Sequence, residues 1–278
     1  MCKFVISACV RSDVGRIRNN NEDNYRLLDV FRKDVEQNNS EASINCTDQK
    51  AIFSVCDGMG GEECGEIASL IAVQNIRSTE KKTFKEIAIE DAVSINAMVC
   101  KAAIEKNISR MGSTMANLYI DAGTAIAANV GDSRVYFYRK GILKQLTMDH
   151  DEAARLVNMG VLTIEQAQTD KRRHQLTQYL GMNDEEIVPE PYFCDEIKIS
   201  DGDRFLLVSD GVTDDLTDDD IAKILNKGLL PKETVDTIVD TALERSGHDN
   251  ITAIVVDIKE NAKSFWKVMR GWLHGDRI

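Results

Sequence analysis

Short runs of apolar residues, separated by polar turns, recur along the chain and predict β-strands. They lie at 51–56, 116–120, 124–130, 134–138, 204–208 and 251–258. These runs are rich in Val, Ile, Phe and Tyr, residue types that strands favour. The runs at 124–130 and 134–138 are joined by only Gly131-Asp132-Ser133, and a connection that short makes neighbouring strands antiparallel. The pattern therefore predicts antiparallel sheets.

A second pattern, with apolar residues three or four positions apart, predicts helices in separate blocks. The longest block runs from Phe84 to Met111. Shorter helices are expected near 164–169, near 218–226 and from Pro231 to about 245, each with a capping or first-turn signal. Helices mixed in this order with antiparallel strands predict an α+β layered sandwich, not a parallel doubly wound sheet.

Two segments interrupt these patterns. Residues 32–50 are polar and aperiodic, which predicts a surface loop. Residues 259–278 hold both tryptophans at helical spacing, with five basic residues against two acidic ones. This tail is interpreted either as a final amphipathic helix packed on the domain or as a docking helix for a partner or an anionic membrane surface. We therefore divide the chain into a domain, 1–258, and a tail, 259–278.

Composition and charge narrow the functional classes. The 278 residues carry a formal net charge of −12, which disfavours broad binding to nucleic acid. No apolar run approaches the roughly 18 residues that a membrane span needs, and the N-terminus lacks the pattern of a secretory signal. The seven cysteines are scattered, without a C-x-x-C pair, which indicates a reduced, cytoplasmic protein.

The most informative feature is a set of aspartates expected directly after apolar strands, in turns that contain glycine. They are Asp57, Asp132, Asp210 and Asp249. A single Asp-Gly is usually an ordinary turn, but four such positions predict carboxylates that converge on one site. Carboxylates so close together would take up protons unless a cation neutralises them. Oxygen ligands favour the hard divalent ions Mg²⁺ or Mn²⁺.

Signatures of competing chemistries are missing from the sequence. Gly60 and Gly65 are followed by Glu66 where a P-loop needs lysine. No cysteine precedes an arginine by six positions, and the G-x-S-x-G elbow of α/β-hydrolases is absent. These absences leave metal-assisted chemistry as the favoured class.

Seven motifs resemble, in order, those of the metal-dependent serine/threonine protein phosphatases, the type 2C or PPM family in its bacterial form. They are SDVGRIRNNNEDNY (12–25), DGMGGEECGEIAS (57–69), GST (112–114), VGDSRVY (130–136), LTMDHD (146–151), SDGVTD (209–214) and DNIT (249–252). The match covers about residues 5–258. It implies a four-layer sandwich of two antiparallel sheets flanked by helices, with a flap near 150–192.

The resemblance also implies a site for two metal ions, with a third and weaker one. Asp57 would bridge the first two ions, and the Gly58 carbonyl would hold one of them. Asp210 and Asp249 resemble ligands of the other ion. Two further ligands are implied: Asp23, acting through water with Glu22 beside it less certain, and Asp132, sharing the third ion with Asp210.

Arg18 occupies the place of the arginine that grips the substrate phosphate in this family, and a surface salt bridge is its alternative role. The implied reaction is in-line attack on phosphorus by a water that bridges two Mn²⁺ or Mg²⁺ ions, with Asp57 and Arg18 as catalytic residues. Met59 stands where eukaryotic relatives have histidine, so the proton donor is unassigned.

The expected function is that of a cytoplasmic signalling enzyme that dephosphorylates phosphoserine and phosphothreonine in proteins and opposes a Ser/Thr kinase. One alternative is a non-catalytic phosphoprotein-binding regulator on the same fold; another is a phosphatase confined to one partner-switching protein. Lys171, Arg172 and Arg173 in the predicted flap would favour acidic phosphopeptides, or form a solvated helix end.

Overall fold

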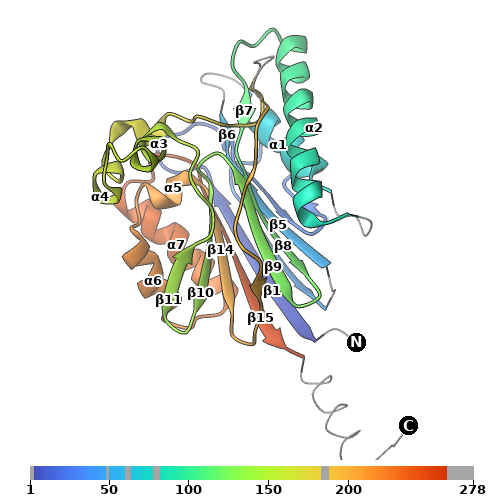
Figure 1. Ribbon diagram of the computed structural model, residues 1–278, viewed down its shortest axis with the longest axis vertical. Helices are drawn as coiled ribbons and strands as arrows, with labels where there is room; N and C mark the ends of the chain where they lie inside the picture. Colours follow the sequence, from blue (N-terminus) through green and yellow to red (C-terminus); the bar gives the residue numbers. More distant parts are fainter. Residues whose placement is uncertain (1–2, 48–49, 60–63, 78–81, 183–187, 262–278) are drawn as a thin grey trace, which may run out of the picture.

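Two antiparallel sheets lie face to face in the computed structural model, which describes residues 3–47, 50–59, 64–77, 82–182 and 188–261 (Figure 1). The first sheet has six strands in the order β11-β10-β14-β15-β1-β4. Their bounds are β1 (Phe4–Asp13), β4 (Ser40–Cys46), β10 (Arg134–Arg139), β11 (Ile142–Gln145), β14 (Arg204–Val208) and β15 (Ile251–Glu260).

The second sheet has seven strands, with the main order β12-β9-β8-β5-β2-β3 and β13 paired to β9. Their bounds are β2 (Asn24–Leu27), β3 (Val30–Phe31), β5 (Lys50–Cys56), β8 (Met115–Asp121), β9 (Thr124–Val130), β12 (Tyr192–Phe193) and β13 (Ile197–Lys198). A separate two-stranded ladder joins β6 (Gly58–Met59) to β7 (Gly112–Ser113).

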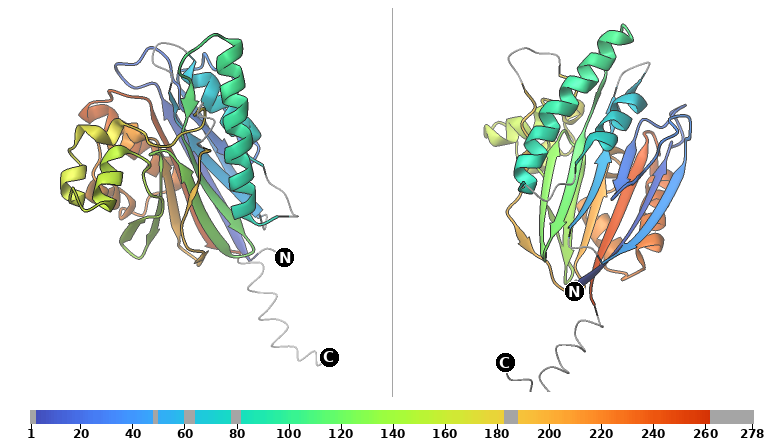
Figure 2. Two further views of the ribbon diagram at one scale, coloured as in Figure 1. Left: turned by 45° about the horizontal axis from the view of Figure 1, so that its top comes forward. Right: turned by 90° about the vertical axis from the view of Figure 1, so that its right-hand side faces the viewer.

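Helices cover the outer faces of both sheets and complete four layers (Figure 2). The helices α1 (Gly65–Asn75) and α2 (Phe84–Glu105) pack on the second sheet, and α6 (Asp218–Leu225) and α7 (Pro231–Arg245) on the first. Between the sheets lies an apolar core that includes Phe53, Leu118 and Phe205. The predicted α+β sandwich with four layers is confirmed.

A group of short helices stands at one end of the sandwich. It comprises α3 (Glu152–Asn158), α4 (Ile164–Ala167) and a 3₁₀ turn, η1 (Lys171–His174), all within the predicted flap, with α5 (Asp210–Thr213) beside them. The segment is attached to the body through the Ser113–Leu180 bridge and through an ion pair between Arg173 and Asp214.

Several local predictions hold. The six predicted strands correspond to β5, β8, β9, β10, β14 and β15. Thr163 caps α4 with Gln166 in a capping box, and Pro231 occupies the first turn of α7. The long helix ends at Glu105, six residues before the predicted Met111, and Asn107 just beyond it has a positive φ of 56°, a conformation that does not continue a right-handed helix.

The prediction of a surface loop over 32–50 is wrong in its second half. Residues 40–46 form β4, the edge strand that pairs with β1. Only one face of an edge strand meets the core, so Ala42, Ile44 and Cys46 pack inward while polar residues alternate with them. The inward-facing positions include only one large apolar side chain, Ile44, so the sequence pattern did not predict a strand here.

The N-terminal strand β1 and helix α1 were also not predicted. Most of the tail, 262–278, lies outside the described residues, so neither interpretation of it is tested. No helix in the described part of the chain is long and apolar enough to cross a membrane.

Candidate metal centre

The register of the second sheet places Asp23 next to Asp57. Asp23 immediately precedes β2, Asp57 immediately follows β5, and Asn24 pairs with Cys56 across these antiparallel strands. In an antiparallel pair, the start of one strand and the end of its neighbour lie at the same edge. The two carboxylates therefore share one rim.

The first sheet supplies Asp210 and Asp249 by the same geometry. Asp210 follows β14 as the first residue of α5, and Asp249 precedes β15. Next to them, the Ser209 backbone N–H donates to the Thr252 carbonyl at 3.1 Å. The expectation that every aspartate directly follows a strand is thus wrong for Asp249. Because β15 runs antiparallel to β14, the start of β15 lies at the same edge of the sheet as the end of β14.

Asp132 lies between β9 and β10, where the chain passes from one sheet to the other. The prediction that these two runs are neighbouring antiparallel strands is therefore wrong, because the short turn at Gly131 joins two sheets. Gly131 before it has a φ of +99°, and a β-carbon there would lie 2.7 Å from Thr114 Cγ2, so the turn requires glycine. The Thr114 hydroxyl accepts from the Asp57 backbone N–H at 2.9 Å and lies 2.7 Å from the Ser133 hydroxyl. Thr114 thereby ties the Asp57 and Asp132 turns together.

Gly58 brings the rim against helix α1. Its N–H donates to the Glu22 carbonyl at 3.2 Å, and a β-carbon at this position would lie 2.1 Å from the Gly65 carbonyl oxygen. Only glycine allows so close an approach. Gly58 of the Asp-Gly motif thus lets the Asn-Glu-Asp segment and α1 pack together beside Asp57.

Five aspartates, named here the carboxylate rim, lie close enough for their charges to affect one another: Asp23, Asp57, Asp132, Asp210 and Asp249. Burial and then the charges of Asp23, Asp210, Asp249 and Asp132 raise the pKa of Asp57 well above its ordinary value. Burial, followed by the charges of neighbouring aspartates, also raises the pKa of Asp132.

The same causes act on the other buried rim carboxylates. Burial, opposed by hydroxyl donors and reinforced by the charges of Asp210 and Asp249, raises the pKa of Asp23 to about 7. Burial and the charge of Asp249 raise that of Asp210 to about 6. Glu22, at the edge of the site, also has a raised pKa, chiefly because it is partly buried.

The rim fits a hard divalent cation. Asp23 is fully buried, and its Oδ1 has no hydrogen-bond partner, whereas Oδ2 accepts from the Ser209 hydroxyl at 2.7 Å. An unpartnered buried oxygen is costly, and a set of mutually repelling carboxylates is stabilised by a cation held through oxygen ligands. These are the donor atoms that Mg²⁺ and Mn²⁺ prefer.

Arg18 does lie at the rim, where its Nη2 donates to Asp249 Oδ2 at 2.7 Å. Its side chain is 49% exposed. The arginine therefore makes a salt bridge, the alternative considered for it, although its partner is itself a predicted metal ligand.

Two contributors were missed by sequence reasoning. Arg32 is buried, and its Nη2 donates to the backbone carbonyls of Asn21 and Asp23, the former at 2.7 Å. It thereby holds the Asn-Glu-Asp segment. Ser209 orients Asp23. Ser209 precedes an Asp-Gly and could have been noticed as part of that motif, whereas Arg32 lies in the polar segment assigned to a loop and carries no local signal.

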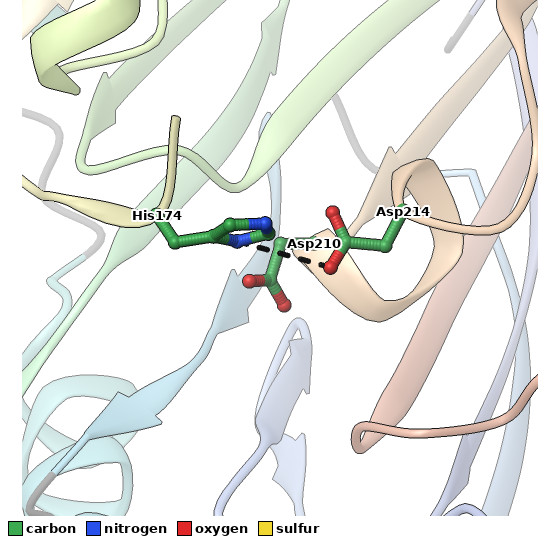
Figure 3. A group of neighbouring side chains, drawn as sticks. All are labelled: His174, Asp210 and Asp214. Carbon is green, nitrogen blue, oxygen red and sulfur yellow. Dashed lines mark ion pairs between the residues drawn. The ribbon is translucent and has the colours of Figure 1, made fainter. Parts of the chain in front are cut away.

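A second polar group adjoins Asp210. The ligand atoms of His174, Asp210 and Asp214 lie within 4.8 Å of one another, and Figure 3 shows the imidazole beside both carboxylates. Asp214, however, is already paired with Arg173 and lies 3.2 Å from His248 Nε2. The guanidinium of Arg173 thus neutralises Asp214.

Comparisons with known proteins agree with this geometry. Residues 18–251 match the family described as "Protein phosphatase 2C". The chain is 30% identical over 256 residues to the serine/threonine phosphatase stp of Listeria monocytogenes, covering 89% of this chain and 94% of that protein. The S. agalactiae serine/threonine phosphatase structure superposes with a TM-score of 0.76 at 26% identity, covering 91% of this chain and 99% of that one.

A further solved structure with a similar fold contains bound metal ions. The catalytic domain of the phosphatase PstP, in complex with two manganese ions, superposes with a TM-score of 0.72 at 25% identity, covering 92% of this chain and 100% of that one.

Proposed function

The chain belongs to the protein phosphatase 2C family, and from this premise we propose that its carboxylate rim holds the cations with which it hydrolyses phosphoserine and phosphothreonine. It is a metal-dependent serine/threonine protein phosphatase, with Mn²⁺ or Mg²⁺ as the cofactor typical of the family. The observation that carries the assignment of the rim is the environment of Asp57. Asp57 is partly buried, and its desolvation together with the charges of four other aspartates raises its pKa, an arrangement that a cation would relieve.

We assign the ligands as follows. Asp57, the Gly58 carbonyl, Asp210 and Asp249 would hold two cations, with Asp57 shared between them. Asp23 would act through water, which its unpartnered Oδ1 supports. Asp132 and Asp210 form a weaker third site, supported by the effect of the Asp210 charge on the pKa of Asp132.

The cations, when bound, lower the pKa of a water toward neutrality and neutralise charge on the phosphoryl group. Arg18 binds the phosphoryl oxygens through parallel N–H donors, for which a guanidinium is better suited than an ammonium group. Its half-exposed side chain can turn from Asp249 toward substrate because both groups lie at the open edge of the rim. Ser209 and Arg32 keep Asp23 in place from the buried side.

We also propose the cellular setting. The substrates are phosphoproteins, and the enzyme reverses the action of a Ser/Thr kinase in cytoplasmic signalling. The seven cysteines are scattered without a C-x-x-C pair, which supports a reducing compartment. We keep 1–258 as the catalytic domain and 259–278 as a tail, which either packs on the domain as a final amphipathic helix or docks on a partner or an anionic membrane surface. The non-catalytic alternative is not favoured, because Asp57, Asp210 and Asp249 are all present.

The test uses the purified full chain and p-nitrophenyl phosphate. We expect hydrolysis with Mn²⁺ or Mg²⁺ and none after chelation, and calorimetry should detect binding of at least two Mn²⁺ ions per chain. Restoring Mn²⁺ after chelation should restore turnover, which controls for loss of folded protein. Equal hydrolysis in EDTA, or no Mn²⁺ binding at millimolar concentration, would refute the assignment.

A further inference from the structure

A cleft of about 560 Å³ opens between the short helices of the predicted flap and the α5–α6 region. Its wall includes Val157 and Ile164 on one side and Thr213, Asp215 and Asp218 on the other. This acidic cleft, as we name it, also contains Arg134 and Arg173. None of the five rim carboxylates lines it, so it is a neighbouring feature and not the metal centre itself.

The cleft starts one helical turn from the rim. Asp214, at its inner edge, donates its backbone N–H to the Asp210 carbonyl at 2.7 Å. Arg173 of the cleft wall is adjacent in sequence to His174, whose ring faces Asp210 (Figure 3). A helical turn rises about 5.4 Å and an extended peptide about 3.3 Å per residue. A substrate residue about two to four positions from the phosphorylated one can therefore reach the cleft.

The two arginines of the cleft are already matched by carboxylates. Arg134 Nε lies 2.9 Å from Asp149 Oδ2 and its Nη2 binds the same oxygen. Arg173 pairs with Asp214. Both pairs are internally neutral and leave no free positive charge for an acidic ligand.

Three further aspartates of the lining are satisfied by neutral donors. Asp151 accepts from the Ala154 N–H at 2.7 Å, Asp215 from the Ser246 hydroxyl at 2.6 Å, and Asp218 from the Tyr136 hydroxyl at 2.9 Å. Hydrogen bonds of this kind orient a carboxylate but leave its charge. Arg245, whose Nη1 donates to the Asp215 backbone carbonyl at 2.6 Å, forms its ion pair with Asp220. The lining therefore keeps an excess of negative charge.

Apolar side chains make up much of the remaining wall. Ile164 is 66% exposed and Met148 is 38% exposed, and both line the cleft with Ala167 and Leu216. An apolar wall under an acidic edge fits a segment that carries both hydrophobic and basic side chains, such as lysine or arginine stems that lie along apolar surface.

We propose that the acidic cleft binds a basic, partly apolar segment of the phosphoprotein substrate, close in sequence to the phosphorylated residue. This inference rests on the proposed function and adds a substrate class to it. It is opposite to the acidic phosphopeptides that the Lys171, Arg172 and Arg173 cluster suggested. Arg172 is bound to Asp170 and Arg173 to Asp214, so two of these three cations are already occupied.

The test compares two phosphothreonine peptides that differ only at positions two to four from the phosphate, with arginines in one and glutamates in the other. The wild-type chain, with Mn²⁺ present, should cleave the arginine peptide with a kcat/KM at least about fivefold higher. Since an exposed ion pair contributes little, Asp218→Asn should lower this preference by about two- to threefold. Asparagine retains an acceptor for Tyr136, which keeps the local structure.

The matched control is Asp219→Asn. Asp219 is the next residue of α6, exposed, and does not line the cleft. The Asp219→Asn variant loses the same charge as Asp218→Asn. If the cleft itself sets the preference for the arginine peptide, this variant should keep the wild-type preference. The preference should also fall as salt is raised, because exposed charges are screened.

Three results would overturn the inference while leaving the phosphatase assignment intact. They are equal turnover of both peptides, a preference for the glutamate peptide, and equal loss of preference in the two variants. Loss of wild-type turnover of p-nitrophenyl phosphate with Mn²⁺ would instead reject the proposed function, and this inference with it.

Discussion

The carboxylate rim and the acidic cleft lie side by side and are built from the same residue type, yet their charges are handled differently. In the cleft, Asp149 and Asp214 have arginine partners and Asp218 has a hydroxyl donor. In the rim, burial and neighbouring aspartates raise the pKa of Asp57, and Asp23 Oδ1 has no partner. Carboxylates that already have partners in the protein, as in the cleft, can add only weak, selective attraction for a substrate. Carboxylates without such partners, as in the rim, need a bound cation to neutralise their charge.

Removing one rim carboxylate should have the largest effect. Asp57→Asn is expected to reduce turnover of p-nitrophenyl phosphate by several orders of magnitude, because the bridging ligand of the proposed cations is lost. The fold should survive, and in EDTA the variant should melt no lower than the wild type, since a buried like charge is removed. Steady-state kinetics and thermal unfolding measure both. Asp219→Asn, away from rim and cleft, should match the wild type; a fully active Asp57 variant would contradict the site.

The rim should also make the metal-free protein sensitive to pH. The pKa of Asp23 is raised to about 7 and that of Asp210 to about 6, so the folded state binds protons that the unfolded state releases. Their stabilising contribution is fully present below about pH 4 and is lost as pH rises through 6 and 7. For Asp23 alone the loss is up to about 4 kcal/mol.

Denaturant unfolding in EDTA between pH 5 and 8 measures this contribution, and stability should fall across the interval. Added Mn²⁺ should restore it at the upper end, because a ligand that binds only the folded state stabilises it. A metal-free stability that rises steadily to pH 8 would show that the rim carboxylates are not in the repulsive arrangement described here.

Arg32 is a buried cation close to the rim, and it is held by backbone carbonyls. Replacing it with methionine should destabilise the protein by about 2–4 kcal/mol, because the carbonyls of Asn21 and Asp23 lose their donor. Since these carbonyls flank the Asn-Glu-Asp segment, Mn²⁺ affinity should fall as well. The measurements are denaturant unfolding and calorimetric titration with Mn²⁺. Arg26→Met, at a partly buried arginine that donates to Val73, is the control, and it should leave Mn²⁺ affinity unchanged.

The smallest effect is expected in the cleft. Arg173→Gln removes the ion pair that joins the η1 turn to Asp214, whereas Arg172→Gln removes a pair within the turn, with Asp170. The first change should raise amide hydrogen exchange over residues 150–180, with a loss of about 1 kcal/mol of local stability. The second should not raise it. Equal exchange in both variants would mean that the Arg173 pair does not hold the segment.

Much of the fold could be predicted from local patterns. β14 and β15 are fully buried apolar runs for most of their length, and Thr163 and Pro231 mark helix starts that the structure contains. β4 was not predicted because only one face of this edge strand packs on the core, so few of its residues need to be apolar. Helix α1 was not predicted because the glycine-rich sequence before it carries the signal of a turn.

For the site, the sequence alone determined which residue types were available: aspartates beside apolar strands, in motifs that identify their chemistry. It could not determine that Asp249 precedes its strand, that Arg18 turns to Asp249, or that Arg32 holds the Asn-Glu-Asp segment. The tertiary structure decided these points, because the distance between charges and their burial depend on strand register and sheet packing. Local sequence does not set those quantities, because they depend on contacts between residues far apart in the chain, such as Ser209 with Asp23 and Arg18 with Asp249.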